Sequence, residues 1–241
     1  MTATLTPDTG TTGSAAPAAP PRRGLTGLLV AVIAVALLVA GGGLAVALGI
    51  GRTDPPAADS VDAGFARDMS QHHLQAVEMA NLAQTRSQDP EVLRLAFDIS
   101  ATQTNQVGRM QGWLTLWGLP LTGGDRMAWM SDTSATEHGG HDMSAMDPTA
   151  AADGAVMPGM ATETELTQLR SLSGPAFDVM FLQLMIRHHE GGLDMAQYGQ
   201  THATEAAVRS LARSIVVAQS AETATMTDML TARGGTPLPF R

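Results

Sequence analysis

The sequence predicts an all-α protein: a four-helix bundle built from two duplicated helical hairpins and preceded by one transmembrane helix. Three observations predict this fold. They are an internal repeat, prolines and glycines at the ends of long uninterrupted segments, and an uncharged N-terminal segment. The 241 residues are enough for one such domain with appendages.

The N-terminal segments precede any globular region. Residues 1–24 are rich in Ala, Thr, Pro and Gly, which predicts a disordered cytoplasmic tail. Residues 25–50 carry no charge and exceed the roughly 20 residues that span a bilayer, so we expect a membrane anchor there. Arg22 and Arg23 precede this anchor, and positive residues stay on the cytoplasmic side. The C-terminal domain is therefore expected outside the cytoplasm. Cleavage after Ala47, giving a secreted form, is the alternative.

The composition excludes several classes of function. The formal net charge is −9, and the chain contains no lysine, so its surface repels nucleic acid and anionic lipid. There is no cysteine, which excludes disulfides and thiolate metal sites. Fifteen methionines are present, and all except Met1 follow the predicted anchor. Soft-metal chemistry, if present, must use methionine and histidine.

An internal duplication determines the predicted fold. When the sequence is shifted by 116 positions it matches itself without a gap, and two Met-x-x-His-His motifs align. Matched positions include Phe65 with Phe181, Met69 with Met185, His72-His73 with His188-His189, Met79-Ala80 with Met195-Ala196, and Gly118 with Gly234. Two rare motifs in the same register indicate one duplicated structural unit.

Each copy is predicted to be a pair of antiparallel helices. After a linker over residues 51–60, the first hairpin covers residues 61–118, with Pro90 opening its second helix. The second hairpin covers residues 174–235 and ends at two glycines. Two hairpins with one apolar stripe each stack as a four-helix bundle. Residues 119–173 between them, rich in Gly, Ser, Thr and Ala, are predicted to form a flexible loop that contains Met and His.

The inward stripe of the first and third helices carries the candidate metal ligands. At 100° per residue, both Met-x-x-His-His motifs fall on the stripe that faces the core. Imidazole suits copper, zinc, iron and nickel, whereas thioether selects Cu(I). Copper, as Cu(I) or Cu(II), is therefore the expected cofactor, ahead of zinc and iron. The predicted metal ligands are His72, His73, His188, His189, Met69, Met79, Met185 and Met195.

Other residues are assigned supporting roles. Gln103 and Gln106 share the inward face of the second helix, and the fourth helix presents Gln219 and Glu222. The predicted outer partners or further ligands are Glu222, Gln103, Gln219, Asp62 and Asp178, although helix capping also explains the two aspartates. The loop offers auxiliary ligands at His138, His141, Met143, Met146, Met157 and Met160. The alternative interpretation is that the methionines only fill the core and that the buried histidines only form hydrogen bonds.

Two sequence blocks resemble a known family. The blocks are Phe65-x-x-x-Met69-x-x-His72-His73-x-x-Ala76-x-x-Met79-Ala80 and Phe181-Leu-x-x-Met185-Ile-x-His188-His189-x-x-Gly192-x-x-Met195-Ala196. They resemble the domain-of-unknown-function 305 family over residues 61–234, apart from the central loop. The resemblance implies a ferritin-like four-helix bundle in an exported bacterial protein, with copper binding and tolerance known for some relatives. It marks the same eight His and Met residues, and Gly192 departs from the alanine usual in the family.

Together these features predict a binding protein rather than an enzyme. We expect a membrane-anchored extracytoplasmic protein that sequesters or delivers copper, or provides copper tolerance, through His and Met ligands. Its predicted partners are a metal ion and, through the N-terminal helix, the membrane; nucleic acid is excluded, and the sequence identifies no protein partner. The alternatives are a redox enzyme with bound copper or iron, and a metal-free structural or interaction bundle.

Overall fold

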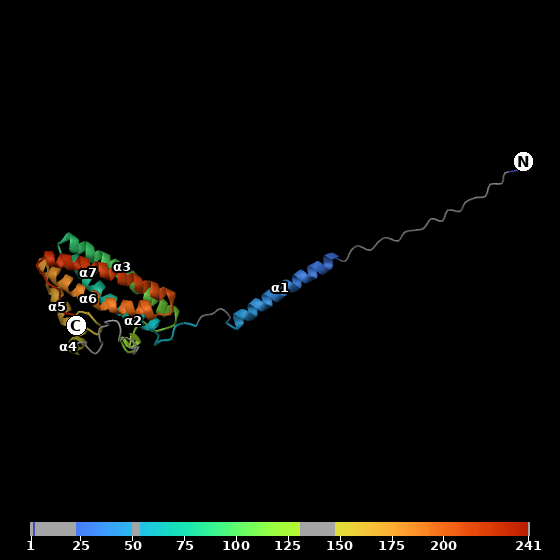
Figure 1. The fold of residues 1–241 in the computed structure, drawn as a ribbon, viewed down its shortest axis with the longest axis horizontal. Coiled ribbons are helices and arrows are strands. Elements are labelled where there is room, and N and C mark those ends of the chain that lie inside the picture. The colour runs from blue at the N-terminus through green and yellow to red at the C-terminus, as the bar shows by residue number, and fades with distance from the viewer. Residues whose placement is uncertain (1, 3–22, 50–53, 131–147, 241) are drawn as a thin grey trace. The chain divides into compact units, whose positions relative to one another are not determined.

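The structure, a computed structural model, describes residues 2, 23–49, 54–130 and 148–240, and these residues form helices and no strand. The chain divides into two compact units, Met1–Asp54 and Pro55–Arg241. Among its described residues the first unit contains one helix, α1 (Arg23–Ala47), and the second unit contains the bundle (Figure 1). The predicted all-α fold with one N-terminal apolar helix is confirmed.

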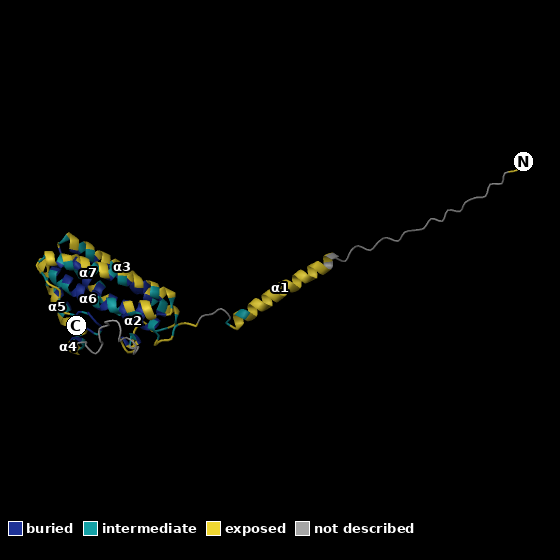
Figure 2. Ribbon diagram, viewed as in Figure 1, coloured by how far each residue is buried: buried dark blue, intermediate teal, exposed yellow. Residues whose placement is uncertain are grey.

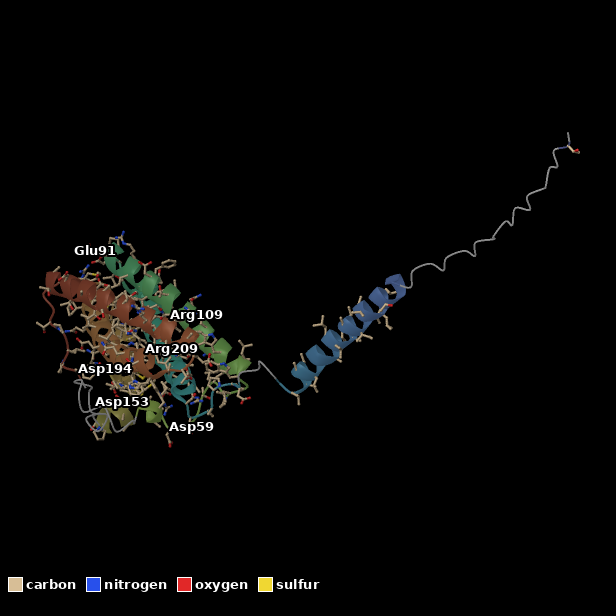
Figure 3. The ribbon with its side chains drawn as sticks, turned by 45° about the vertical axis from the view of Figure 1, so that its right-hand side comes forward. Asp59, Glu91, Arg109, Asp153, Asp194 and Arg209 are labelled. Carbon is tan, nitrogen blue, oxygen red and sulfur yellow. The ribbon has the colours of Figure 1, made fainter. Side chains whose placement is uncertain are left out.

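Helix α1 is apolar around its whole circumference. Its stretch Thr26–Ala47 has 22 residues and a mean hydropathy of 2.7, and by length and composition it is able to cross a membrane. Its side chains project on all sides of the helix and are exposed along most of its length (Figures 2 and 3). A helix that is hydrophobic all round is typical of a membrane span rather than of an amphipathic surface helix.

Four long helices make the bundle of the second unit. They are α2 (Val61–Arg86), α3 (Pro90–Leu116), α6 (Gly174–His202) and α7 (Ala206–Ala232). Helix α2 packs on α3 and helix α6 packs on α7, and the two hairpins meet through α2 and α6 (Figure 1). The duplicated helical hairpins that the sequence predicts are therefore present.

Local sequence explains where these helices begin and end. The side chains of Ser60 and Asp89 accept hydrogen bonds from backbone N–H groups in the first turns of α2 and α3. Pro90 follows at the first position of α3, where its missing N–H costs nothing. Gly118 and Gly234 follow the ends of α3 and α7 with φ of +69° and +71°. Glycine adopts this left-handed conformation without steric cost, so both copies of the repeat end in the same way.

The start of α7 is capped by a residue of another helix. Asp62 of α2 is buried, and its carboxylate accepts hydrogen bonds from the Thr204 N–H at 3.0 Å, the Thr204 hydroxyl at 2.7 Å and the Glu205 N–H at 2.8 Å. Asp62 also precedes His72 by ten residues, which is about 15 Å along a helix. The structure therefore makes Asp62 a cap that joins the two hairpins and not a partner of the histidines.

The segment predicted as a flexible loop contains short elements over its described residues. These are the 3₁₀ helix η1 (Ala128–Met130) and the helices α4 (Pro148–Ala152) and α5 (Glu163–Ser171). Asp68 holds η1 on α2 by accepting hydrogen bonds from the Met127 N–H and the Trp129 Nε1–H, both at 2.8 Å. Thr162 and Glu165 form a reciprocal capping box at the start of α5. These local caps and contacts order residues whose composition indicates a loop.

Two clusters of buried apolar side chains fill the bundle. The Phe177 cluster draws on residues 76–83 of α2, 92–99 of α3, 177–186 of α6 and 226–230 of α7. The Phe65 cluster draws on residues 63–69 of α2, 110–114 of α3, 195–196 of α6 and 208–215 of α7. On each helix a stretch between these ranges belongs to neither cluster. The core is therefore interrupted midway along the bundle.

Replacing Asp62 with Ala is expected to lower the free energy of unfolding by about 0.5–2 kcal/mol, the usual cost of losing a helix cap, because the donors at the start of α7 lose their buried acceptor. Chemical denaturation of the full chain in detergent micelles measures the change. Asp59, which is exposed three positions earlier, provides the control, and Asp59→Ala should stay within about 0.5 kcal/mol of the unmodified protein. Equal stability of the two variants would contradict the capping role.

Candidate metal centre

A polar layer occupies the interruption between the two apolar clusters. We call it the histidine layer. Its members are His72 and His73 of α2, Gln103 and Gln106 of α3, His188 and His189 of α6, and Gln219 and Glu222 of α7. All four histidine side chains are completely buried. The inward stripe predicted for α2 and α6 therefore brings both histidine pairs to one level of the bundle.

The two histidine pairs meet where α2 and α6 cross. The ring centroids of His72 and His188 are 3.8 Å apart, with their planes tilted by 36°. Within each pair the centroids are 6.4 Å apart. Gly192 permits this approach, because a Cβ atom there would lie 3.0 Å from His72 Cε1 and 2.8 Å from Gln219 Oε1. Gly192 thus borders the layer directly.

Main-chain carbonyl groups hold the two inner rings. The Nε2 atom of His188 lies 3.0 Å from the carbonyl oxygen of His72. The Nε2 atom of His72 lies 3.1 Å from the carbonyl oxygen of Pro158, in the segment between the hairpins. A carbonyl oxygen only accepts, so each ring donates from Nε2 and its Nδ1 carries the lone pair of the neutral imidazole.

Side chains of the partner helices hold the two outer rings. The Nε2 atom of His73 donates to Gln106 Oε1 at 2.7 Å, and that of His189 donates to Glu222 Oε2 at 2.7 Å. Gln106 and Glu222 occupy equivalent positions of the repeat, but one is neutral and the other carries a carboxylate. The two halves of the layer therefore have the same geometry and different charge.

The layer contains many buried polar atoms without partners. Among the described residues, the Nδ1 atoms of all four histidines have no hydrogen-bond partner, and neither do the side-chain amides of Gln103 and Gln219. Each such atom costs about 1–3 kcal/mol. Histidines that bind metals through one nitrogen donate a hydrogen bond from the other, as these do. The residues of the layer therefore fit a metal ion that accepts imidazole ligands.

Burial lowers the pKa of three imidazoles of the layer, those of His72, His73 and His188. Loss of hydration lowers the pKa of His72 to about 4. The hydrogen bond to the Pro158 carbonyl raises this pKa, and the nearby His189 lowers it further. Burial, with the neighbouring His72, lowers the pKa of His73 to about 3. Burial and the adjacent imidazoles also hold the pKa of His188 well below its usual range. At neutral pH these three rings need not lose a proton before they bind a metal ion.

The four predicted methionine ligands are buried on both sides of the layer. Met69 and Met195 belong to the Phe65 cluster, and Met79 and Met185 belong to the Phe177 cluster. Met69 and Met185 precede the histidine pair of their own helix by about one turn. Met79 and Met195 follow their pair at a distance of about 10 Å along the helix. The thioethers therefore lie on both sides of the layer, at different distances from the histidine pairs along the helices.

The donors do not form a ready-made coordination sphere. An imidazole binds a metal in the plane of its ring, at about 2.0 Å. The rings of His72 and His188 face one another, so their planes do not meet at that distance from both rings. In the part of the chain that the structure describes, no three His, Asp or Glu side chains are grouped so as to hold an ion. An ion shared by both pairs requires at least one ring to turn.

Several predicted site residues lie away from the layer or outside the described residues. Asp178 precedes His188 by ten residues, about 15 Å along the helix, which excludes direct contact. Met157 is buried in the Phe65 cluster, and Met160 is half-buried against it, so neither belongs to an open loop. The remaining auxiliary candidates fall in residues 131–147, outside the described residues: His138, His141, Met143 and Met146.

Two partners of the histidines were not recognisable from the sequence. The Pro158 carbonyl is a main-chain group, and it reaches His72 only because the segment between the hairpins packs on the bundle. The periodicity of α3 places Gln106 on the inward face without showing that it is the partner of His73. The only sequence signal near the Pro158 contact was the short Met157–Met160 motif. The main chain of this motif makes the contact with His72, and its sulfur atoms do not.

The fold and the layer define the class of four-helix bundles that carry donor side chains in their interior. Within that class, the chain belongs to the family described as "Domain of unknown function (DUF305)", whose model matches residues 62–230. The family resemblance inferred from the two Met-x-x-His-His blocks is therefore confirmed.

Solved structures with the same fold support this assignment. A DUF305 protein from Streptomyces coelicolor is 43% identical, with 76% of this chain and 99% of that chain covered and a TM-score of 0.64. A DUF305 fragment from Deinococcus radiodurans is 31% identical, covering 74% and 99%, with a TM-score of 0.56. CopM in its Cu(II)-bound form is 26% identical, covering 72% and 97%, with a TM-score of 0.50. Among the curated proteins no match was found.

The buried histidines predict a pH-dependent stability of the metal-free protein. As the pH falls below 6.5, the histidines of the unfolded chain become protonated. In the folded protein, His72 and His73 stay neutral until about pH 4 and about pH 3. The free energy of unfolding should therefore be level above pH 7 and decrease below it, by up to about 1.4 kcal/mol per pH unit for each of His72, His73 and His188.

Denaturation of the full chain between pH 7 and pH 5 measures this slope. His73→Gln should reduce it by the share of one histidine. His202→Ala, which removes an exposed histidine at the end of α6, should leave it unchanged. A slope that is the same in both variants would contradict neutral burial of His73.

Proposed function

We propose that this protein is a membrane-anchored, extracytoplasmic copper-binding protein that sequesters or delivers copper through His and Met ligands. The observation that carries the proposal is the set of four buried Nδ1 atoms that have no hydrogen-bond partner in the described part of the chain, while the Nε2 atom of each ring has one. Helix α1 supports the anchor by its length and composition. The fold is shared with CopM, which was solved in a Cu(II)-bound form.

The proposed ligands follow from the geometry of the layer. His72, His73, His188 and His189 are the primary donors, through Nδ1. Thioether sulfur prefers Cu(I), and the methionines one turn before each histidine pair are nearer than those that follow it. Met69 and Met185 are therefore the first soft donors, and Met79 and Met195 are reserve donors. In this proposal, Cu(I) bound in the layer provides the Nδ1 atoms with the partner that they otherwise lack within the described ranges of the chain.

The charge of the layer also favours a cation. Glu222 is its only acidic member, and its side chain is 22% exposed. A carboxylate bonded to a ligating histidine raises the basicity of that ligand and fixes its orientation. Its negative charge balances the single positive charge of Cu(I), which lowers the cost of burying the ion. Gln103 and Gln219 are outer partners in this proposal, because their side-chain amides are buried and have no hydrogen-bond partner among the residues that the structure describes.

Removing the outer histidines tests the proposal. The double variant His73→Ala/His189→Ala should weaken Cu(I) binding by more than the roughly 10- to 100-fold that loss of an outer partner costs, because two donors disappear. Competition with a chromophoric Cu(I) chelator, using the full chain in detergent micelles, measures the affinity. His202→Ala removes an exposed histidine and should bind as the unmodified protein does.

Equal affinity in the double variant and in the control would leave the histidines as hydrogen-bonded core residues and would contradict a copper centre in the layer. Circular dichroism and the unfolding midpoint of the metal-free variants establish that both remain folded. A rise of that midpoint on addition of copper, present in the control and absent in the double variant, would support binding to the folded layer.

Glu222→Gln removes the carboxylate while keeping the shape of its side chain. We expect about a 10-fold loss of Cu(I) affinity and a larger loss of Cu(II) affinity, since the lost charge interacts with twice the ionic charge. Chelator competition in reducing and in oxidising buffer measures both constants. The control is Asp228→Asn, which removes the same charge from an exposed position on α7 and should change neither the Cu(I) nor the Cu(II) affinity. An equal loss of affinity for Cu(I) and Cu(II) would mean that Glu222 acts only by orienting His189 and not through its charge.

A further inference from the structure

Residues 157–161 form a strap that crosses the helices carrying the histidine pairs. Its first residue, Met157, is buried in the Phe65 cluster, and its last, Ala161, is buried in the Phe177 cluster. The strap therefore passes from one apolar cluster to the other, across the level of the histidine layer. Its second residue is Pro158, whose carbonyl group accepts the hydrogen bond from His72 Nε2.

Two glycines bring the strap into contact with α6. A Cβ atom on Gly191 of α6 would lie 2.0 Å from the Pro158 carbonyl oxygen, and a Cβ atom on Gly159 would lie 2.3 Å from the Arg187 carbonyl oxygen. Gly159 also has φ of +74°, a conformation that costs other residues strain. The strap thus lies so close to the backbone of α6 that any side chain at either glycine would move the Pro158 carbonyl.

Side chains of α2 and α6 fix the strap at its C-terminal end. Gln75 of α2 donates to the Ala161 carbonyl at 2.9 Å and accepts from the Ala161 N–H at 2.7 Å. Arg187 of α6 is completely buried, donates to the Met160 carbonyl at 3.4 Å and pairs with both oxygens of Glu165 at 3.0 and 2.6 Å. A buried ion pair with two parallel hydrogen bonds has a specific geometry. These contacts hold the strap in one position against both helices.

The strap supplies a hydrogen-bond acceptor that the duplicated helices do not provide for His72. In the second copy, His188 donates from Nε2 to a carbonyl of α2, inside the bundle. In the first copy, the equivalent bond of His72 goes to Pro158, outside the repeat. Without the strap, His72 Nε2 would lose this acceptor, and the neutral ring would be free to carry its proton on Nδ1. A protonated Nδ1 cannot bind a metal ion.

We propose that the strap is a positioning element of the metal centre: the Pro158 carbonyl, placed by Gly159, Gly191 and Gln75, holds His72 in the tautomer that presents the Nδ1 lone pair to the layer. This inference rests on the proposed function for its consequence, metal binding. Its structural part, control of the tautomer of His72, is independent of any metal. The strap is therefore expected to act through His72 and not as a ligand.

Nitrogen NMR of the full chain, labelled with ¹⁵N-histidine in detergent micelles and free of metal, tests the proposal. In the unmodified protein, the His72 and His188 resonances should both show a protonated Nε2 and a bare Nδ1. Gly191→Ala displaces the Pro158 carbonyl, so His72 should gain Nδ1 protonation while His188 keeps its tautomer. Gln75→Ala, which frees the strap without crowding α6, should shift His72 in the same direction and keeps the test valid if Gly191→Ala does not fold.

Cu(I) affinity is measured on the same samples by chelator competition. We expect a loss of about 10- to 100-fold for Gly191→Ala, the usual effect of removing an outer partner, and about 10-fold for Gln75→Ala. Gly112→Ala on α3, whose Cβ would meet no atom within 4 Å, is the control and should change neither tautomer nor affinity. The unchanged signal of His188 in the variants separates loss of one contact from general loosening of the bundle.

The outcomes distinguish the two ideas. A His72 tautomer that is unchanged in folded Gly191→Ala and Gln75→Ala proteins would overturn the role of the strap, as would a changed tautomer with undiminished Cu(I) affinity. If the unmodified protein fails to bind Cu(I), the proposed function is wrong and the strap loses its role in metal binding. The NMR result then still decides whether the Pro158 carbonyl controls His72.

Discussion

The burial of four imidazole rings inside a helical bundle is the constraint on which the rest of the structure depends. Each ring has two polar nitrogens, and a buried polar atom is costly without a partner. The four Nε2 atoms are satisfied by α2, α3, α7 and the strap, so these parts must all be in place around α2 and α6. Apolar clusters on both sides of the layer supply the burial free energy that offsets its polar groups.

The duplication gives the layer its symmetry, and two departures make its halves unequal. Gln106 and Glu222 hold equivalent histidines, but only Glu222 adds a negative charge. His188 is held by the bundle, whereas His72 is held by Pro158. The segment between the hairpins occurs once in the chain, and its Pro158 carbonyl accepts a hydrogen bond from His72 of the first copy. A repeated fold thus acquires a single charged side and a single strapped side in the histidine layer.

The sequence predicted the fold well because its signals are local and repeated. The shift of 116 positions, Pro90 and the glycines after α3 and α7 mark the two hairpins, and the helical period predicts that the histidines and methionines are buried. It predicted Asp62 and Asp178 less well. A helical wheel gives the direction of a side chain but not its height, and ten residues separate each aspartate from the histidines by about 15 Å. The sequence also predicts Met157 as an auxiliary loop ligand, whereas the structure packs it in the core.

The sequence by itself determined the helices, their duplication and the donor types that face inward, because these follow from backbone period and residue chemistry along a short stretch of chain. Only the tertiary structure decided which nitrogen of each ring is free. The partners of the Nε2 atoms lie 33 to 116 positions away, and one of them is a main-chain carbonyl that any residue would supply. Such a bond leaves no mark on the sequence, since it exists only when the helices and the strap pack together.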